Sequence, residues 1–150
     1  MSKLFAVLMI TAALAVPAVA QEKKITKKDL PAAVQKAVDE QTKGAEIVGY
    51  TKEVEKGKTE YEVETKVNGH TRDLLFDPAG KLIVAEEETP IDKIPAAAKA
   101  TIEKKAGDGK ITIVETLTKG TTVTYEAVIT PKKGKKFEVQ VDANGKEVKE

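Results

Sequence analysis

The sequence predicts an α+β fold with two tandem repeats, each a helix packed on one face of a four-stranded antiparallel sheet. Three observations predict it. Similar segments recur in the same order about 64 residues apart, each copy opens with a proline-led apolar pattern of helical period, and each continues with runs of alternating apolar and polar residues. A change from a period of 3.6 to a period of two is typical of a helix followed by half-buried strands.

The duplication is visible in four pairs of matching segments. The pairs are Leu30–Val34 with Ile94–Ala98, Ile47 with Ile111, Tyr61–Val63 with Tyr125–Ala127, and Asp77–Lys81 with Asp142–Lys146. The first three pairs are 64 residues apart and the last is 65 apart. Four matches in one order predict a duplicated unit. We place the first repeat at residues 21–88 and the second at residues 89–150.

Residues 1–20 have the features of a secretory signal peptide. Lys3 provides a positive charge, residues 4–16 are apolar, and Ala18-Val19-Ala20 is a small-residue cleavage site. The alternative is a membrane anchor, but the apolar run is shorter than the roughly 20 residues that span a bilayer. We therefore expect cleavage after Ala20 and a mature protein that is periplasmic or secreted.

Each repeat is expected to open with a short helix. In the first repeat, residues 31–42 carry Val34 and Val38 at helical spacing, so one apolar stripe faces the core. Pro31 and Pro95 stand at the two expected starts, where the missing N–H of proline removes no hydrogen bond. Glycines follow both apolar patterns and are expected to end the helices.

Four alternating segments follow each expected helix. In residues 59–67, for example, Tyr61 and Val63 alternate with Glu60 and Glu62, which is typical of a half-buried antiparallel strand. Turn residues such as Asn-Gly and Asp-x-x-Gly separate the segments. The predicted strands are 46–54, 59–67, 70–77 and 81–87 in the first repeat, and 110–117, 121–130, 135–142 and 145–149 in the second.

The charge balance excludes some classes of partner. After removal of residues 1–20 the chain has 24 basic and 24 acidic residues, and the two signs are mixed along it. This pattern differs from the basic stripe of a nucleic-acid-binding protein. We therefore expect no nucleic-acid partner and no membrane association once the signal peptide is removed. The oligomeric state is left open by the sequence.

The chain carries few residues that could perform catalysis. It has no cysteine, and its one serine, Ser2, lies in the expected signal peptide, so thiol and serine nucleophiles are absent from the mature chain. His70 is the single histidine and follows a hairpin turn, where a solvated position is expected. A zinc site lacks its ligands. We predict a protein that is not an enzyme and has no cofactor, no catalytic residue and no metal site.

Two acidic patterns have a structural interpretation and a functional one. The Asp-Gly turns at 77–80 and 142–145 resemble calcium loops only faintly, because such loops need several oxygen ligands and a closing glutamate. We favour turns in which aspartate accepts local N–H bonds. The glutamates at 60, 62 and 64 share one strand face, and those at 86–88 end the fourth predicted strand. We interpret them as solvated carboxylates with unshifted pKa values rather than as an acid–base pair.

Three apolar residues are candidates for contact with another protein. Tyr50 and Leu75 have the opposite parity to the apolar residues near them, and Val128 does the same in the second repeat. If the register holds, all three project from the outer sheet face among the glutamates. Exposed apolar groups ringed by polar ones are typical of a protein-binding patch. The alternative is a β-bulge that turns them inward.

The motifs together resemble a known family. Leu30-Pro31-Ala32-Ala33, followed by the Tyr61-Glu62-Val63 strand and the Asp77-x-x-Gly80-Lys81 turn, is similar to the PepSY-like family, and in particular to its putative beta-lactamase-inhibitor-like (BLIP-like) branch. The resemblance recurs in the second repeat. It implies a small exported domain without enzymatic activity, with a helix on a four-stranded sheet, that binds other proteins. The matching residues are fold residues and imply no inhibitory residue.

The functional expectation follows from the absent catalytic groups and from this resemblance. We expect an exported, non-enzymatic protein-binding domain that inhibits or modulates a peptidase or another cell-envelope enzyme. A periplasmic sensor of a ligand or of calcium, built on the two Asp-Gly turns, is the alternative.

Overall fold

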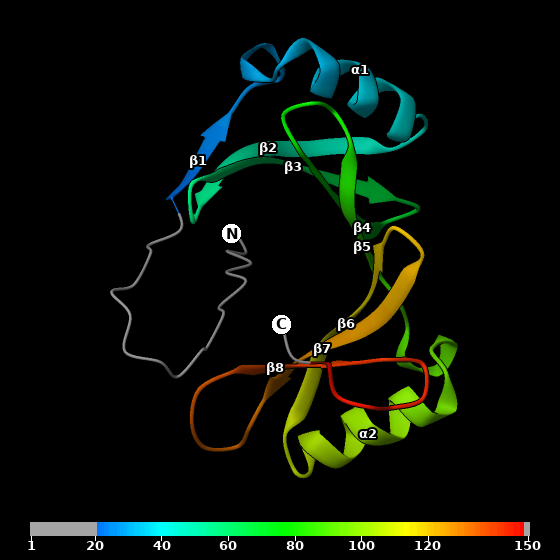
Figure 1. Ribbon diagram of the computed structural model, residues 1–150. Helices are drawn as coiled ribbons and strands as arrows, with labels where there is room; N and C mark the ends of the chain where they lie inside the picture. Colours follow the sequence, from blue (N-terminus) through cyan, green and yellow to red (C-terminus); the bar gives the residue numbers. More distant parts are fainter. Residues whose placement is uncertain (1–20, 149–150) are drawn as a thin grey trace.

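The computed structural model describes residues 21–148, and the expected signal peptide lies outside the described residues. Eight strands form a strongly curved sheet, with one α-helix outside each end of it (Figure 1). The strands are β1 (Gln21–Ile25), β2 (Glu46–Glu55), β3 (Lys58–Val67), β4 (His70–Phe76), β5 (Leu82–Glu88), β6 (Lys110–Lys119), β7 (Thr122–Thr130) and β8 (Phe137–Val141). The helices are α1 (Ala32–Gln41) and α2 (Ala96–Ala106), with short 3-10 turns at Lys27–Asp29 and Ile91–Lys93.

The strands form one antiparallel sheet in chain order, from β1 to β8. The predicted α+β class is confirmed, but the prediction of a separate four-stranded sheet in each repeat is wrong. β5 pairs with β6, from Ala85 opposite Thr118 to Glu88 opposite Glu115, and this pairing joins the two halves. The predicted last strand, 145–149, contributes a single bridge between Val141 and Glu147 within the described residues. The tandem repeat itself stays a prediction.

The two helices lie on the same side of the sheet, and each has its own core. Successive side chains of a strand point to opposite sides of the sheet. The continuous register from β4 to β7 places the core residues under α1 and those under α2 on the same side. The core at α1 comprises Leu30, Val34, Val38, Tyr61, Val63, Leu74 and Phe76. The core at α2 comprises Ile94, Ala98, Ile102, Val114, Ala127, Ile129, Val139 and Val141. The predicted apolar stripes therefore face the sheet, and neither helix of the described residues lies on its other side.

The polar segment before α1 contains structure that the sequence did not predict. β1 pairs with β2 in register, from Gln21 opposite Val54 to Ile25 opposite Tyr50. The 3-10 turn that follows is closed by Asp29, whose Oδ2 accepts hydrogen bonds from the N–H of Thr26 at 2.9 Å and from its hydroxyl at 2.8 Å. β1 is polar because it is an edge strand with little buried surface, so apolar alternation does not reveal it.

The Asp-Gly turns hold the sheet against the starts of the helices. Oδ1 of Asp77 accepts the N–H groups of Ala79 at 2.9 Å and Lys81 at 3.0 Å. Asp142 does the same with Asn144 and Lys146. The predicted turn chemistry is confirmed.

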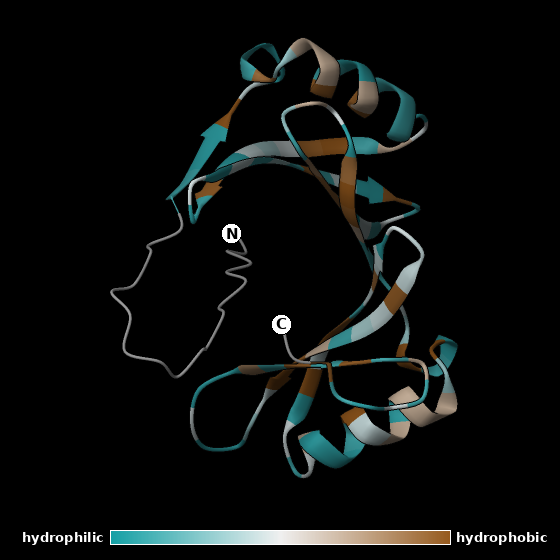
Figure 2. Ribbon diagram, viewed as in Figure 1, coloured by the Kyte–Doolittle hydropathy of each residue, from teal (hydrophilic) through white to brown (hydrophobic). Residues whose placement is uncertain are grey.

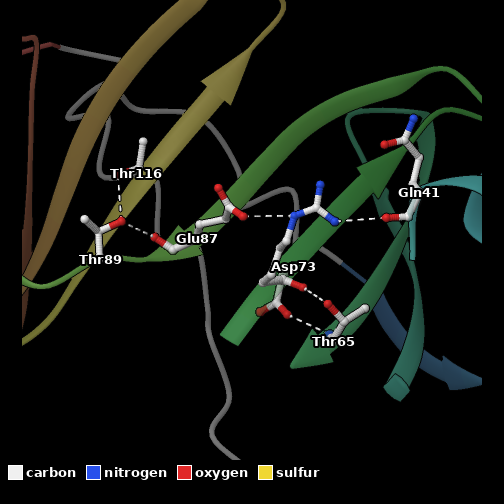
Figure 3. Close-up of polar contacts among 7 residues, drawn as sticks. Gln41, Thr65, Asp73, Glu87, Thr89 and Thr116 are labelled. Atoms are coloured by element: carbon white, nitrogen blue, oxygen red, sulfur yellow. Dashed lines mark hydrogen bonds and ion pairs between the residues drawn. The ribbon is translucent and has the colours of Figure 1, made fainter. Parts of the chain in front are cut away.

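A polar network ties α1 to the strands at the junction of the two halves (Figure 3). The guanidinium of Arg72 donates from Nη1 to the carbonyl oxygen of Gln41, at the C-terminus of α1, at 3.1 Å. Its Nε lies 3.1 Å from Oε1 of Glu87 on β5. The hydroxyl of Thr89 then donates to the Glu87 carbonyl at 3.0 Å and lies 2.8 Å from the hydroxyl of Thr116 on β6. One side chain thus links a helix end to the strand that continues into the second half.

We predict that Arg72→Lys lowers the free energy of unfolding by about 1–2 kcal/mol. An ammonium group lacks the planar fork that reaches Gln41 and Glu87 together, and the Arg72 side chain is only 22% exposed. Urea unfolding measures the change. Lys132→Ala is the control, because its ion pair with Asp108 is exposed and is expected to contribute less than about 0.5 kcal/mol. Equal losses for both variants would contradict a role for the network.

Candidate functional site

The side of the sheet opposite both helices is curved inward, and we call it the concave face (Figure 1). Hydrophilic and hydrophobic residues alternate along several of its strands (Figure 2). The pleat and the register place a long set of side chains on this face. The set includes Thr51, Glu53, Glu60, Glu62, Glu64, Asp73, Leu75, Val84, Glu86, Glu88, Ile113, Glu115, Leu117, Thr124, Glu126, Val128, Glu138 and Gln140. The same alternation places Lys24, Lys58, Lys66 and Lys119 on this face, at or near the ends of their strands.

Carboxylates cross the middle of the concave face in two staggered rows. In the first row Glu64, Asp73 and Glu86 lie directly opposite one another on β3, β4 and β5. The second row comprises Glu88, Glu115 and Glu126 on β5, β6 and β7. Directly opposite residues have Cβ atoms about 4.5–5.5 Å apart, and like charges at that distance destabilise a sheet. The rows meet on β5, so one acidic band crosses five strands.

Several carboxyl groups of the concave face, both in the band and beside it, have pKa values above the usual range. Burial, together with the charges of Glu53 and Asp73, raises the pKa of Glu62 to about 8. Burial and the charge of Glu86 raise the pKa of Glu115 to about 7. Burial also raises the pKa of Asp73 to about 6, although its Oδ1 accepts the N–H of Thr65 at 3.2 Å. Burial and the charge of Glu22 raise the pKa of Glu53.

The prediction that these glutamates are solvated and unshifted is therefore wrong for Glu62. Alternation within one strand shows which face a residue takes, but not which residues lie beside it on the neighbouring strands. Here β4 brings Asp73, and β5 brings Glu86, to the side of β3 that carries Glu62. The sequence holds one signal of this crowding, because every strand from β2 to β8 carries at least one acidic residue at a position that alternates with its core-facing residues.

Two of the three predicted contact residues lie on the concave face. Leu75 is half-buried and lies opposite Glu62 on β3 and Val84 on β5. Val128 is half-buried and lies opposite Ile113 on β6 and Glu138 on β8. Small apolar groups therefore stand between carboxylates in both halves of the face. The role of these residues as protein contacts stays a prediction.

The predicted outward position of Tyr50 is wrong. β2 contains a bulge between Ile47, which pairs with Thr65, and Gly49, which pairs with Glu64. The extra residue, Val48, reverses the parity, so Tyr50 lies opposite Val63 and packs against the core at α1. This is the alternative that the alternation left open, since a bulge turns a side chain to the other face. Tyr50 therefore leaves the set of candidates on the concave face.

The remaining candidates show no catalytic or metal-binding geometry. Within residues 21–148, no three histidine or acidic side chains converge as metal ligands would. His70 is exposed at the start of β4 and lines a surface pocket of about 340 Å³ with Glu88, Ile91 and Ile111. The Oδ1 atoms of Asp77 and Asp142 already accept backbone N–H bonds. Between Gln21 and Val148, neither helix has the length and apolar character of a membrane span.

Comparison with solved structures shows the fold. A DUF2874 family protein from Bacteroides ovatus is similar with a TM-score of 0.65 at 13% identity, over 80% of this chain and 85% of that one. A putative periplasmic protein from Bacteroides eggerthii is similar with a TM-score of 0.64 at 18% identity, over 79% of this chain and 86% of that one. A BLIP-like protein from Bacteroides fragilis is similar with a TM-score of 0.60 at 18% identity, over 79% of this chain and 83% of that one. At these identities the likeness concerns the fold alone.

Comparison with families covers the first part of the chain. Residues 18–84 match the family model described as putative beta-lactamase-inhibitor-like, PepSY-like. A comparison with curated proteins finds no match. The resemblance that the proline-led helix, the tyrosine strand and the Asp-Gly turn predict, to the PepSY-like, beta-lactamase-inhibitor-like family, is therefore confirmed for residues 18–84.

Proposed function

We propose that this protein is a non-enzymatic periplasmic binding protein that holds a protein partner on its concave face. The observation that carries the proposal is the face itself, a curved surface across β2 to β8 that mixes carboxylates with Leu75, Val84, Ile113 and Val128. Neither helix of residues 21–148 covers it. Protein interfaces combine apolar contact area with polar groups, and this face offers both. The match of residues 18–84 to a family described as beta-lactamase-inhibitor-like supports an inhibitor or modulator of an envelope enzyme.

Two observations support the proposed periplasmic location. The sequence of residues 1–20 has the features of a cleaved signal peptide. One protein of the same fold is described as a putative periplasmic protein. Fractionation of cells that express the full chain tests the location, with release of a shortened protein by osmotic shock as the expected result. Recovery of the full-length chain with the membranes would contradict it.

We predict that Leu75→Ala with Val128→Ala reduces capture of the partner from a periplasmic extract at least about tenfold. Each substitution removes apolar contact area from the middle of the concave face while leaving the cores intact. The captured proteins are identified and quantified by mass spectrometry. Val123→Ala is the matched control, because Val123 is an apolar residue of β7 that is 40% exposed on the helix side. Equal capture by wild type and the double variant would contradict the proposed face.

A further inference from the structure

The most unusual residue of the concave face is Glu115, in the middle of β6. It is only 5% exposed. It lies opposite Glu88 on β5 and Glu126 on β7. Among residues 21–148, no side chain or backbone group forms a hydrogen bond or ion pair with its carboxyl group. A buried ionisable group is normally paired, so Glu115 stands out within a band that is already crowded with like charges.

Acidic groups surround Glu115 from every neighbouring strand. Glu86 and Glu88 face it from β5 and Glu126 faces it from β7. Asp73 on β4 and Glu138 on β8 add their charges from further away. The polar neighbours Thr124 and Gln140 are engaged with each other, at 2.8 Å. The one arginine of the chain, Arg72, points to the helix side, towards Gln41 and Glu87.

One ion pair of the concave face lies near the β1 edge of the sheet. There Lys24 on β1 lies 3.6 Å from Oε1 of Glu64. This pair is a case in which a carboxylate of the acidic band lies near a lysine ammonium group. At β5 to β7 the described chain supplies no such pair to Glu115. A counter-charge for Glu115 in a complex therefore has to come from outside the described residues.

We propose that the partner on the concave face presents a basic segment, and that one of its lysine or arginine side chains pairs with Glu115 between β5 and β7. This inference rests on the proposed function and names the chemistry of the partner. The neighbouring apolar residues Ile113 and Leu117 lie on the same strand and face. They suit the aliphatic part of a basic side chain and the apolar residues beside it. The carboxyl geometry within the described residues does not suit a bare metal ion.

The raised pKa values are expected to make binding of this partner depend on pH. Glu115, with a pKa of about 7, and Asp73, with a pKa of about 6, are partly protonated near neutral pH. A cation favours the charged form of a nearby carboxyl group. Binding of the basic segment therefore releases protons, and its affinity rises as the pH rises from about 5.5 to about 8. An acidic partner would show the opposite dependence.

The test is calorimetry of the mature chain with short peptides of alternating residues. The probe is a lysine–leucine peptide, and a glutamate–leucine peptide of equal length is its control. We expect the lysine peptide to bind at least about tenfold more tightly at pH 8 than at pH 5.5, with proton release seen as a dependence on buffer ionisation enthalpy. Spermidine is a third arm, because it offers ammonium groups without apolar side chains. Binding of spermidine as tight as that of the lysine peptide would overturn the protein segment as the occupant.

Substitutions then locate the site. Glu115→Gln keeps the shape, removes the charge and is expected to weaken binding of the lysine peptide about fivefold to tenfold. Glu88→Gln is an exposed neighbour in the same row and gives a second variant whose folding is not at risk. Glu40→Gln on α1 is the matched control, since it removes one exposed charge from the helix side. Equal affinity of Glu115→Gln, Glu88→Gln and Glu40→Gln would overturn the inference.

This failure is distinguishable from failure of the proposed function. If peptide binding is insensitive to Glu115 while Leu75→Ala with Val128→Ala still abolishes capture, the face remains and the basic partner is wrong. If neither experiment responds, both proposals fail. A second copy of the chain could also supply a basic segment, because its hairpin at 131–136 is rich in lysine. Analytical sedimentation tests for such self-association. Self-association that Glu115→Gln removes would overturn a foreign partner as the occupant.

Discussion

Gly80→Ala is expected to lower the free energy of unfolding by about 2–5 kcal/mol. Gly80 has a φ of +82°, a conformation that costs an L-residue roughly 1–2 kcal/mol. A Cβ atom at this position would also lie 2.5 Å from the carbonyl oxygen of Ala33, in the first turn of α1. Because that oxygen belongs to the helix backbone, the turn or the helix has to move, and overpacking of this kind costs about 1–3 kcal/mol. Urea unfolding followed by circular dichroism measures the loss.

Gly44→Ala separates the two contributions. Gly44 has nearly the same φ, +80°, but a Cβ atom there would meet nothing within 4 Å. We expect it to lose only the backbone contribution, about 1–2 kcal/mol. Gly145 in the second half offers an independent case, because a Cβ atom there would clash with the backbone of Ala97. Gly57, in the first half, has the same φ of +77° with open space around it and is the matched control. A Gly80→Ala loss no larger than that of Gly44→Ala would show that the turn does not press against α1.

These glycines illustrate what the sequence reveals of this fold. The proline-led helices, the alternating strands and the Asp-Gly turns each depend on a few neighbouring residues, so local patterns predict them with bounds within a few residues. Pairing between β5 and β6 is different, because it joins segments separated by α2. Nothing local distinguishes an edge strand from one that pairs with the next repeat. The two predicted sheets are therefore one in the structure.

The candidate site was predictable in part for the same reason. Leu75 and Val128 lie on the face that their parity predicts. Tyr50 does not, because the bulge at Val48 depends on how β2 meets β3 rather than on either strand alone. Glu115 was missed altogether. Its significance comes from Glu88 on one side and Glu126 on the other, and neither neighbour is visible until the register is known.

The raised pKa values on the concave face lead to the second large prediction. We expect the fold to become less stable as the pH rises from about 5 to about 8. In an unfolded chain, glutamate and aspartate titrate near pH 4. In the folded chain the pKa is about 8 for Glu62, about 7 for Glu115 and about 6 for Asp73. Between these limits the folded state binds more protons than the unfolded state, so the free energy of unfolding falls with pH. Stability from these protons is fully present below about pH 4 and is lost through pH 6 to 8.

The pKa of Asp29 is shifted in the opposite direction, and this shift affects stability in a different pH range. The hydrogen bonds from Thr26 lower its pKa, so its contribution is lost only as the pH falls below the usual range of aspartate. It does not cancel the decline between pH 5 and pH 8. The stability maximum is therefore expected on the acidic side of neutrality.

Glu62→Gln tests the origin of this pH dependence. An amide keeps the shape of the protonated carboxyl group and cannot acquire the charge that Glu53 and Asp73 oppose. The variant is expected to match wild type near pH 5, to exceed it in stability at pH 8 to 9, and to show a shallower slope between them. One proton contributes at most about 1.4 kcal/mol per pH unit, and solvent screening of the half-buried Glu62 reduces this. Urea unfolding at several pH values measures the slope, with Glu40→Gln as the exposed control. Parallel curves for Glu62→Gln and wild type would show that the proton is held elsewhere, because only a group that titrates between the two pH values can change the slope.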